Sequence, residues 1–432
     1  MNKFKLMFLG AVLFSCCMVV EAQRTVSLSL EAAKDSALTH NRQMQNASYD
    51  VKIAEMQRWQ SISSMLPQVT AGFDYQNSMG YKMELNMGGM QISKEIPASG
   101  TFNVTAAMAL SGQQIVGALV SKIALEMSDI TRKQTEQTTI ATTTQLYMSA
   151  LANQKVLSLL DSNKTNIDRV YESTQEAVRI GVVEKTEADK IYVQVMKLQS
   201  AITSARQGVE LLFNTLKLQL GMSADTELLL TDDLDKLTNA EASLELLHTD
   251  FDMSRNYTYQ LLEKNLDLSK KQISLAAAAY SPTLTMAYRF SNIKYFGGEP
   301  LMSTNPPHVV SVGVSLPIFT SGRNVTAIKE KKFQYMKTKN SFDDATNQLQ
   351  IQNKQLRFNL NTAYENFQIQ KENIDVTQRV FQNVTEKFRY GRASSLEVTQ
   401  ASTDLINAQN SYIQALIDMT NAQIELRNLL NK

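Results

Sequence analysis

Cysteine is almost absent from this 432-residue chain, in which Cys16 and Cys17 are the only two. Both fall in an N-terminal segment where two lysines precede an apolar run over residues 6–20, the layout of a secretory signal peptide. We predict a leader over residues 1–22 and a mature chain without thiol or disulfide, stabilised by packing and assembly. The alternative is a lipoprotein signal with a lipid on Cys16, and the sequence leaves it open.

Long apolar runs and an excess of one charge are also missing. Beyond the leader no run reaches 18 apolar residues, which argues against a spanning helix and leaves strands as the way to cross a membrane. The formal net charge is +1, so no nucleic-acid partner is indicated. The three histidines are scattered and no GxxxxGK[ST] loop occurs. We therefore expect no catalytic site, no cofactor and no metal, and the chain is not expected to be an enzyme.

Proline is scarce, and its placement predicts long helices. The chain has seven prolines, and residues 118–180 and 323–390 contain neither proline nor glycine. Because proline disrupts a helix interior, such gaps permit unusually long helices. At about 1.5 Å per residue the second gap could hold a helix of roughly 100 Å.

Apolar residues in the C-terminal segment follow a heptad. From Val398 to Leu429 they recur in alternating three- and four-residue steps, with alanine at every seventh position from Ala401. This pattern is typical of helices that pack closely on other helices. The same seam runs from Ala188 to Leu216, 210 positions earlier, and Gly181 and Gly391 show the same offset. The chain is thus predicted to be an internal tandem repeat. The repeats are placed at residues 23–222 and 249–432, with an inter-repeat segment at 223–248.

Four short segments alternate apolar and polar residues. They lie at about 67–76, 101–110, 282–291 and 308–317, and each has the length of about ten residues that a tilted membrane strand requires. Alternation alone fits a half-buried soluble sheet equally well. The turn-rich segments between paired strands, residues 77–100 and 292–308, are similar to the longer external loops of outer-membrane barrels.

The strand count predicts assembly. Four strands cannot close a barrel, and an open edge in lipid would leave backbone groups unsatisfied. Two copies would give eight strands and a filled interior, whereas three would give twelve and an aqueous lumen. A conduit therefore requires a homotrimer or a larger ring.

Several junctions carry a family resemblance. They are Leu66-Pro67 before the first strand, Val314-Ser315-Leu316-Pro317-Ile318-Phe319 followed by Ser321-Gly322-Arg323, and Arg389-Tyr390-Gly391 followed by Ser395-Leu396-Glu397. With the order of elements repeated twice, the mature chain resembles the TolC family of outer-membrane efflux proteins over nearly its whole length.

The resemblance implies a mainly α fold with a membrane β-barrel. Three chains would form a twelve-stranded barrel in the outer-membrane lipid and a twelve-helix coiled-coil tunnel in the periplasm. Helices near 118–180 and 323–388 would descend, and those near 184–221 and 395–430 would return. The implied function is a passive exit duct of a tripartite efflux or type I secretion system. Substrates would arrive from an inner-membrane pump through a periplasmic adaptor (membrane fusion) protein.

The two hairpin turns would then be the periplasmic tips. Gly181 and Gly391 follow long helices and supply left-handed caps. They either only reverse the chain or also contact the adaptor. The neighbouring residues Arg179, Arg389, Tyr390 and Arg392 complete the predicted contact, although the arginines are equally typical of solvated helix ends.

The resemblance also implies a gate at the tunnel entrance. Family members carry acidic residues after the second turn, and Glu397 occupies the matching position, where three carboxylates would favour cations. Two positions depart from the family pattern, since Gln400 replaces the next acidic residue and Ala393 the arginine. We expect a weaker gate centred on Glu397, with Glu187 and Lys190 contributing from the first repeat. The alternative is a solvated helix face.

The remaining expectations concern the lumen, the belt and a second class of function. Asp74 and Arg289 lie on the polar sides of their strands and would line the barrel lumen, and residues 223–248 would form part of an equatorial belt. The alternative function is a periplasmic coiled-coil scaffold that holds other envelope proteins. The sequence does not separate drug or metal efflux from protein secretion, because the pump selects the cargo.

Overall fold

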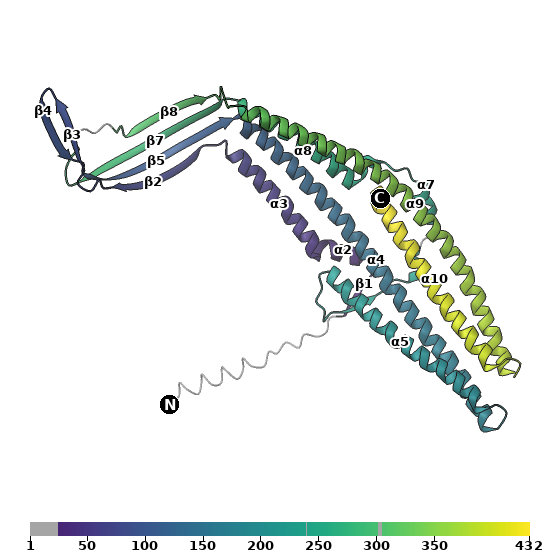
Figure 1. Cartoon of the computed structure of the whole chain (residues 1–432). Coiled ribbons are helices and arrows are strands. Elements are labelled where there is room, and N and C mark those ends of the chain that lie inside the picture. The colour runs from purple at the N-terminus through teal and green to yellow at the C-terminus, as the bar shows by residue number, and fades with distance from the viewer. Residues whose placement is uncertain (1–24, 239, 301–304) are drawn as a thin grey trace, which may run out of the picture. The chain divides into compact units, whose positions relative to one another are not determined.

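The computed structural model describes residues 25–238, 240–300 and 305–432 (Figure 1). The predicted leader and both cysteines lie outside these residues. In chain order the elements are β1 (Thr25–Leu28), α2 (Leu30–His40), α3 (Arg42–Ser63), β2 (Gln68–Gln76), β3 (Lys82–Met87), β4 (Met90–Glu95), β5 (Ala98–Ser111), α4 (Gly112–Arg179), α5 (Lys185–Gln219), β6 (Glu227–Leu230), α6 (Leu234–Leu237), α7 (Glu241–His248), η1 (Met253–Arg255), α8 (Tyr257–Ala277), η2 (Ala278–Tyr280), β7 (Thr283–Phe296), β8 (His308–Ser315), α9 (Arg323–Arg389) and α10 (Ser395–Leu430).

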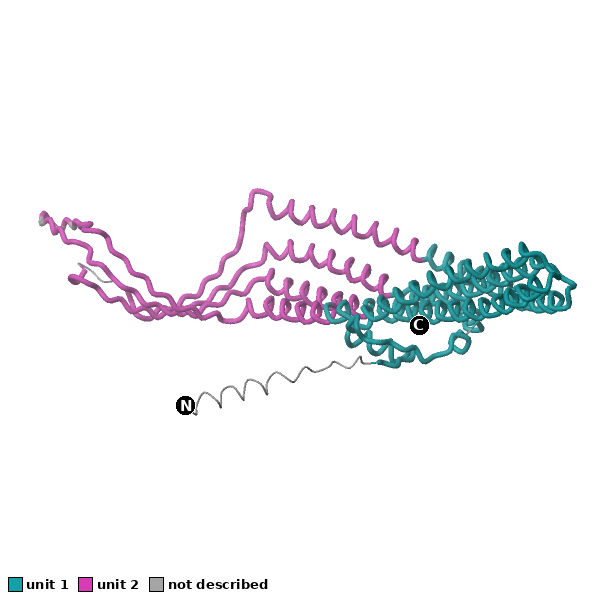
Figure 2. The backbone as a smooth tube through the Cα atoms, turned by 90° about the horizontal axis from the view of Figure 1, so that it is seen from below, with its two compact units in different colours: residues 1–46, 134–256, 350–432 teal, residues 47–133, 257–349 magenta. Residues whose placement is uncertain are grey.

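The chain divides into two compact units (Figure 2). Counting only the described residues, unit 1 lies within residues 25–46, 134–256 and 350–432, and unit 2 lies within residues 47–133 and 257–349. Each unit draws on both halves of the sequence, because the boundaries fall inside α3, α4 and α9. The division into repeats at 23–222 and 249–432 therefore describes the sequence rather than the compact units, and it stays a prediction.

The long helices occur where proline and glycine are absent. Helix α9 has 67 residues and α10 spans residues 395–430, as expected. Helix α4 has 68 residues and begins at Gly112, six positions before the expected start. The glycine is there because of a close approach: its N–H donates to Ser281 Oγ at 3.0 Å, and a Cβ at this position would collide with that side chain. Within the described residues, no helix is both long enough and apolar enough to cross a membrane.

The heptad seams form the core of unit 1. One cluster joins α4, α5, α9 and α10 through Ile167, Ile191, Phe381 and Val398. A second surrounds Leu216 and Leu416 and includes residues of β1, α2 and β6. Along α10 each seam position from Val398 to Leu429 is buried except the half-buried Tyr412. Because the apolar stripe is narrow, this packing leaves the opposite face of each helix polar and exposed.

The inter-repeat segment pairs and hydrogen-bonds with the N-terminal part of the chain. Strand β6 pairs in parallel with β1, and Leu30 N–H donates to Asp232 Oδ2 at 2.6 Å. The buried Tyr147 hydroxyl of α4 lies 2.9 Å from both Asp232 Oδ2 and the Leu28 carbonyl oxygen. Burial and then the Asp232 carboxylate raise the pKa of Tyr147, so the phenol stays protonated. The described residues of the segment 223–248 thus pack on the helices through side chains such as Leu230 and Leu234, and their role as a belt stays a prediction.

Unit 2 contains a four-stranded antiparallel sheet in the order β2-β5-β7-β8. The four predicted strands are present, and β7 continues to Phe296, five residues beyond its predicted end. The segment 77–100, expected to be a loop, contains the hairpin β3-β4. Gly88 and Gly89 join its strands with φ of 56° and 96°, the geometry of a type I′ turn. The Gly-Gly pair between alternating residues was the signal for this hairpin.

Candidate functional site

Both helical hairpins of unit 1 turn at a glycine. Gly181 follows α4 with φ of 77°, and Gly391 follows α9 with φ of 68°. At the first turn Val182 N–H donates to Ala177 O at 2.9 Å, and Gly181 N–H donates to Val178 O at 3.0 Å. The same two bonds recur around Gly391, from Arg392 to Lys387 and from Gly391 to Phe388. Each turn is therefore a Schellman motif whose αL position favours glycine.

The residues beside the turns are exposed and mixed in character. Four apolar side chains point into open surroundings: Ile180, Val182, Tyr390 and Leu396. Arg179 is paired within its own helix, since Nε lies 2.7 Å from Glu176 Oε2. Arg392 contributes its backbone N–H to the second cap. The turns thus present apolar side chains together with cationic groups, a combination suited to a protein partner.

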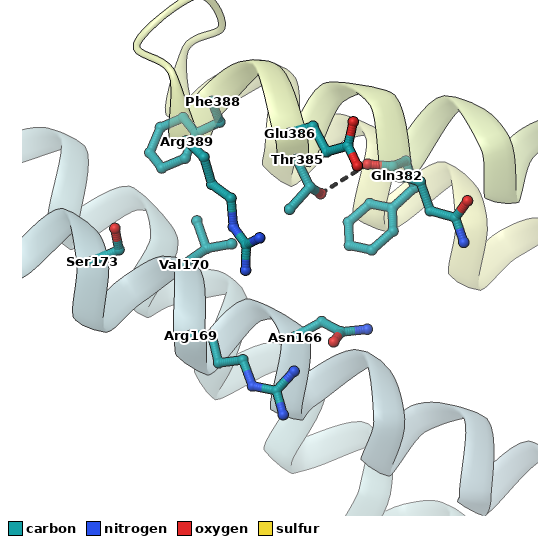
Figure 3. Close-up of a pocket in the computed structure, with 10 residues that line it drawn as sticks. Asn166, Arg169, Val170, Ser173, Gln382, Thr385, Glu386, Phe388 and Arg389 are labelled. Atoms are coloured by element: carbon teal, nitrogen blue, oxygen red, sulfur yellow. Dashed lines mark hydrogen bonds between the residues drawn. The ribbon is translucent and has the colours of Figure 1, made fainter.

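A pocket lies between α4 and α9 next to the second turn. Figure 3 shows Arg389 reaching from α9 toward Val170 of α4, with Arg169 on the facing helix. Thr385 bonds within its own helix, donating to Phe381 O at 2.8 Å. The pocket is lined by Asn166, Arg169, Val170, Ser173, Phe381, Gln382, Thr385, Glu386, Phe388 and Arg389. With two guanidinium groups and one carboxylate, its charge favours a polar or acidic contact.

The four gate candidates belong to two separate groups. On α5, Lys190 Nζ lies 2.6 Å from Glu187 Oε1. The Glu187 carboxylate also accepts a hydrogen bond from Ser395 of α10. On α10, Glu397 bonds to Ser394, and Gln400 Nε2 donates to Asp404 Oδ1 at 2.8 Å. Glu187 and Lys190 thus form an ion pair, whereas the bonds of Glu397 and Gln400 are made with residues next to them in α10 and its cap.

Glu187 has a perturbed pKa. The Lys190 ammonium and then the Ser395 hydroxyl donate hydrogen bonds to its carboxylate and lower its pKa below the ordinary value of 4.5. Ser395 and its neighbour Ser394 were not among the predicted gate residues. Ser394 Oγ accepts from Glu397 N at 3.2 Å as the N-cap of α10, and the spacing Ser394-x-x-Glu397 is the sequence signature of a capping box.

In unit 2 the strand register gathers apolar side chains on one face of the sheet. Val69, Ala106, Tyr288 and Val310 form one row across the four strands. Other rows repeat the pattern, with Met108, Met286 and Val312 in one and Leu110, Leu284 and Val314 in another. Most of these side chains are exposed; Val312, for example, is 64% exposed. An exposed apolar face of this extent marks an interaction site for lipid or protein.

The opposite face is mainly polar, although Val309 and Ile293 also lie on it. Its rows contain Thr70 with Thr105 and Arg289, and Asp74 with Thr101. Asn103 Nδ2 donates to Asp74 Oδ2 at 3.0 Å. Both predicted lumen residues therefore lie on the same face, four positions apart along β5, too far to pair with each other. In the described parts of the chain, no group of three or more His, Asp or Glu residues is placed to hold a metal ion.

Comparison with known proteins places these features in a family. The model of the family described as "Outer membrane efflux protein" matches residues 34–222 and 254–432. Outer membrane protein TolC of Escherichia coli strain K12 is 22% identical over 381 residues, covering 85% of this chain and 75% of that protein. Outer membrane efflux protein BepC of Brucella suis is 21% identical over 423 residues, covering 95% and 87%.

A solved structure shares the fold. The outer membrane protein VceC of Vibrio cholerae superposes with a TM-score of 0.73 at 12% sequence identity, covering 93% of this chain and 95% of that one. At this identity the likeness concerns the fold alone. The order of long helices, paired helices and strands found here is thus that of a solved outer-membrane protein.

Proposed function

The chain belongs to the outer membrane efflux protein family, and from that premise we propose that three copies form the exit duct of a tripartite efflux or type I secretion system. It is an outer-membrane efflux channel, as its relatives are. The proposal adds the homotrimer, the periplasmic adaptor that meets its helical tips, and the inner-membrane pump that drives substrates into it.

The exposed apolar face of the sheet carries the proposal. Rows of Val, Tyr, Met and Leu side chains across the strands are mostly exposed within the described residues of unit 2. Such a face is stable where its surroundings are hydrocarbon, and the polar rows behind it would then line an aqueous lumen. Asp74 and Arg289 are the charged members of those rows.

The edges of the sheet support the assembly of copies. Within the described residues β2 and β8 form the two edges. In lipid each edge needs a partner for its backbone N–H and C=O groups. Pairing β2 of one copy with β8 of the next satisfies both edges, and three copies then give a closed ring of twelve strands with room for a lumen.

The hairpin turns support the adaptor contact. They combine exposed Tyr390 and Leu396 with the Arg169–Arg389 pocket. We propose that this surface, with Arg179, Gly181, Gly391 and Arg392, receives the adaptor. The caps shape the turn, and the apolar and cationic side chains make the contact.

The gate is assigned to Glu397 at the start of α10. In a trimer its three copies lie at one level, where charged groups act most strongly on ions. Replacing Glu397 with Ala is expected to increase the open probability or weaken the cation selectivity of single channels. Gln414→Ala is the matched control, because Gln414 is an exposed glutamine further along α10 that bonds to Asp418 of the same helix. Unchanged closure and selectivity in Glu397→Ala would remove this residue from the gate.

The function is tested by reconstitution. Protein purified from the outer-membrane fraction and added to planar lipid bilayers is expected to produce stepwise ion conductance without ATP. The scaffold alternative predicts a protein that is recovered in the water-soluble periplasmic fraction and conducts nothing. That outcome would replace the duct with the scaffold.

A further inference from the structure

Charged side chains are scarce in the four-stranded sheet of unit 2. Strands β2, β5, β7 and β8 contain only three Asp, Glu, Lys or Arg residues, which are Asp74, Arg289 and Lys294. Arg289 and Lys294 are both exposed residues of β7, five positions apart. Because side chains alternate along a strand, these two point to opposite faces of the sheet. Arg289 is therefore the only lysine or arginine that these four strands place on the mainly polar face.

The neighbours of Arg289 on that face are uncharged. In its row, Thr105 of β5 and Val309 of β8 lie on either side. Along β7 the nearest positions of the same face are Ala287 and Ser291. All four side chains are shorter than arginine, and Arg289 is exposed. No described residue forms an ion pair with Arg289, so its charge is not neutralised within the described chain.

The one carboxylate of the same face lies at another level. Asp74 belongs to the row of Thr101 and Ile293, four positions from Arg289 along β7. At about 3.4 Å per residue this is roughly 14 Å along the strand. Asp74 Oδ2 accepts a hydrogen bond from Asn103 Nδ2 at 3.0 Å. Within one chain the positive and the negative group of this face are therefore separate.

We propose that three copies of Arg289 form a ring in the barrel lumen that attracts the anionic groups of outgoing solutes, such as carboxylates, sulfates and phosphates. The inference rests on the proposed trimeric duct and adds a charge preference at a defined level of it. Guanidinium groups suit this role because they donate paired hydrogen bonds to oxyanions. Strand β7 begins at the helical end of the sheet, so an outgoing anion reaches the level of Arg289 before that of Asp74.

The dimensions of a twelve-stranded ring make this charge effective. Strands about 4.8 Å apart and tilted by about 40° close into a ring roughly 24 Å across between backbones. Arginine extends from that wall toward the axis, which brings three charges within about 8 Å, one Debye length, of an ion on the axis. Coulomb's law in water with that screening gives about a two- to threefold excess of chloride there over its concentration in the bath.

Reversal potentials across a planar bilayer with a potassium chloride gradient test the ring. Arg289→Gln is expected to lower the chloride-to-potassium permeability ratio by about two- to threefold relative to the unchanged channel. Lys294→Gln is the matched control, because it removes the same charge from the opposite face of the same strand and should leave the ratio unchanged. Asp74→Asn should raise the ratio, since it removes a negative charge from the lumen.

A second variant tests the ring without removing Arg289. Thr105 lies opposite Arg289 in the register, so Thr105→Asp places a carboxylate beside each guanidinium group. This variant should lower the ratio as Arg289→Gln does, and it decides the question if Arg289→Gln is not recovered in the membrane. Arg289→Lys should keep the ratio of the unchanged channel.

The possible outcomes separate the ring from the duct. If the channels conduct but neither Arg289→Gln nor Thr105→Asp shifts the ratio more than Lys294→Gln does, the ring is wrong while the duct stands. If the unchanged protein does not conduct at all, the proposed duct fails and the ring fails with it.

Discussion

The sheet of unit 2 and the helical seam of unit 1 use similar apolar residues in opposite ways. In the seam, Leu416 and Val398 are fully buried against other helices. In the sheet, Val312 and Val314 lie on an open face. The seam is stabilised as the core of a water-soluble protein is, whereas the sheet face requires an apolar solvent. One chain thus contains two regions suited to two solvents, which is the arrangement expected of a duct that joins a membrane to an aqueous compartment.

The same kind of truncation should have unequal effects in the two regions. Leu416→Ala removes a side chain that is 0% exposed, and we expect a loss of about 2–5 kcal/mol in the free energy of unfolding. Val312→Ala should change it by much less, because the side chain is already exposed within the chain. Chemical denaturation in detergent, followed by helical circular dichroism, measures both. Equal losses would contradict the division into a packed core and an open face.

A charge should distinguish the two faces of the sheet. Val312→Arg places a guanidinium on the face assigned to lipid. Near the bilayer centre this destabilises each chain by about 2–4 kcal/mol. Ser311→Arg is the matched control, since Ser311 is the adjacent residue of β8 and points to the polar face. We expect the first variant to be depleted from the outer-membrane fraction and the second to be retained. Equal recovery would break the assignment of the apolar face.

Replacing glycine with alanine should destabilise the hairpin turn but not a helix interior. In Gly391→Ala the alanine must adopt the left-handed φ of 68°, which destabilises the folded state by about 1–2 kcal/mol. Gly208 lies inside α5, and no other atom lies within 4 Å of the position that a new methyl group would occupy. Gly208→Ala should therefore stabilise the helix by about 0.5–1 kcal/mol. Thermal unfolding of the two variants should shift in opposite directions. A shift of the same sign in both would show that the cap geometry is not what the turn depends on.

The smallest expected effect is on the pH dependence of the tip. The folded pKa of Glu187 is below its ordinary value of 4.5, so its contribution to stability is present above pH 4.5 and is lost as the pH falls through the folded pKa. Glu187→Gln should make the unfolding midpoint depend less on pH in that acidic range. Glu176→Gln is the control, an acidic residue of α4 that pairs with Arg179 of the same helix. If the unfolding midpoint of Glu187→Gln depends on pH as steeply as that of the unchanged protein, the contacts of the Glu187 carboxylate do not stabilise the tip.

The sequence predicted much of this fold because its signals are periodic. The gap without proline or glycine and the heptad from Val398 predicted α9 and α10 to within three residues at each end, and alternation predicted the four strands of the sheet. The start of α4 was missed because Gly112 is explained by a contact with Ser281, a residue distant in sequence. The hairpin β3-β4 was missed because its Gly-Gly turn was interpreted as a loop. The first miss depends on a contact distant in sequence, whereas the second is a local turn signal that was misinterpreted.

The candidate site was less accessible to sequence reasoning. The turn glycines were found from their position after long helices. The grouping of the gate residues was not found, because it depends on which face of α5 meets α10, and Ser395 at that contact carries no charge to mark it.

The mass of the native protein in mild detergent tests the central claim most directly, namely that one chain is a third of a closed channel. We expect a single species that contains three copies and is extracted from the outer membrane. A protein that remains one chain under those conditions, or that is recovered without detergent, would contradict the account.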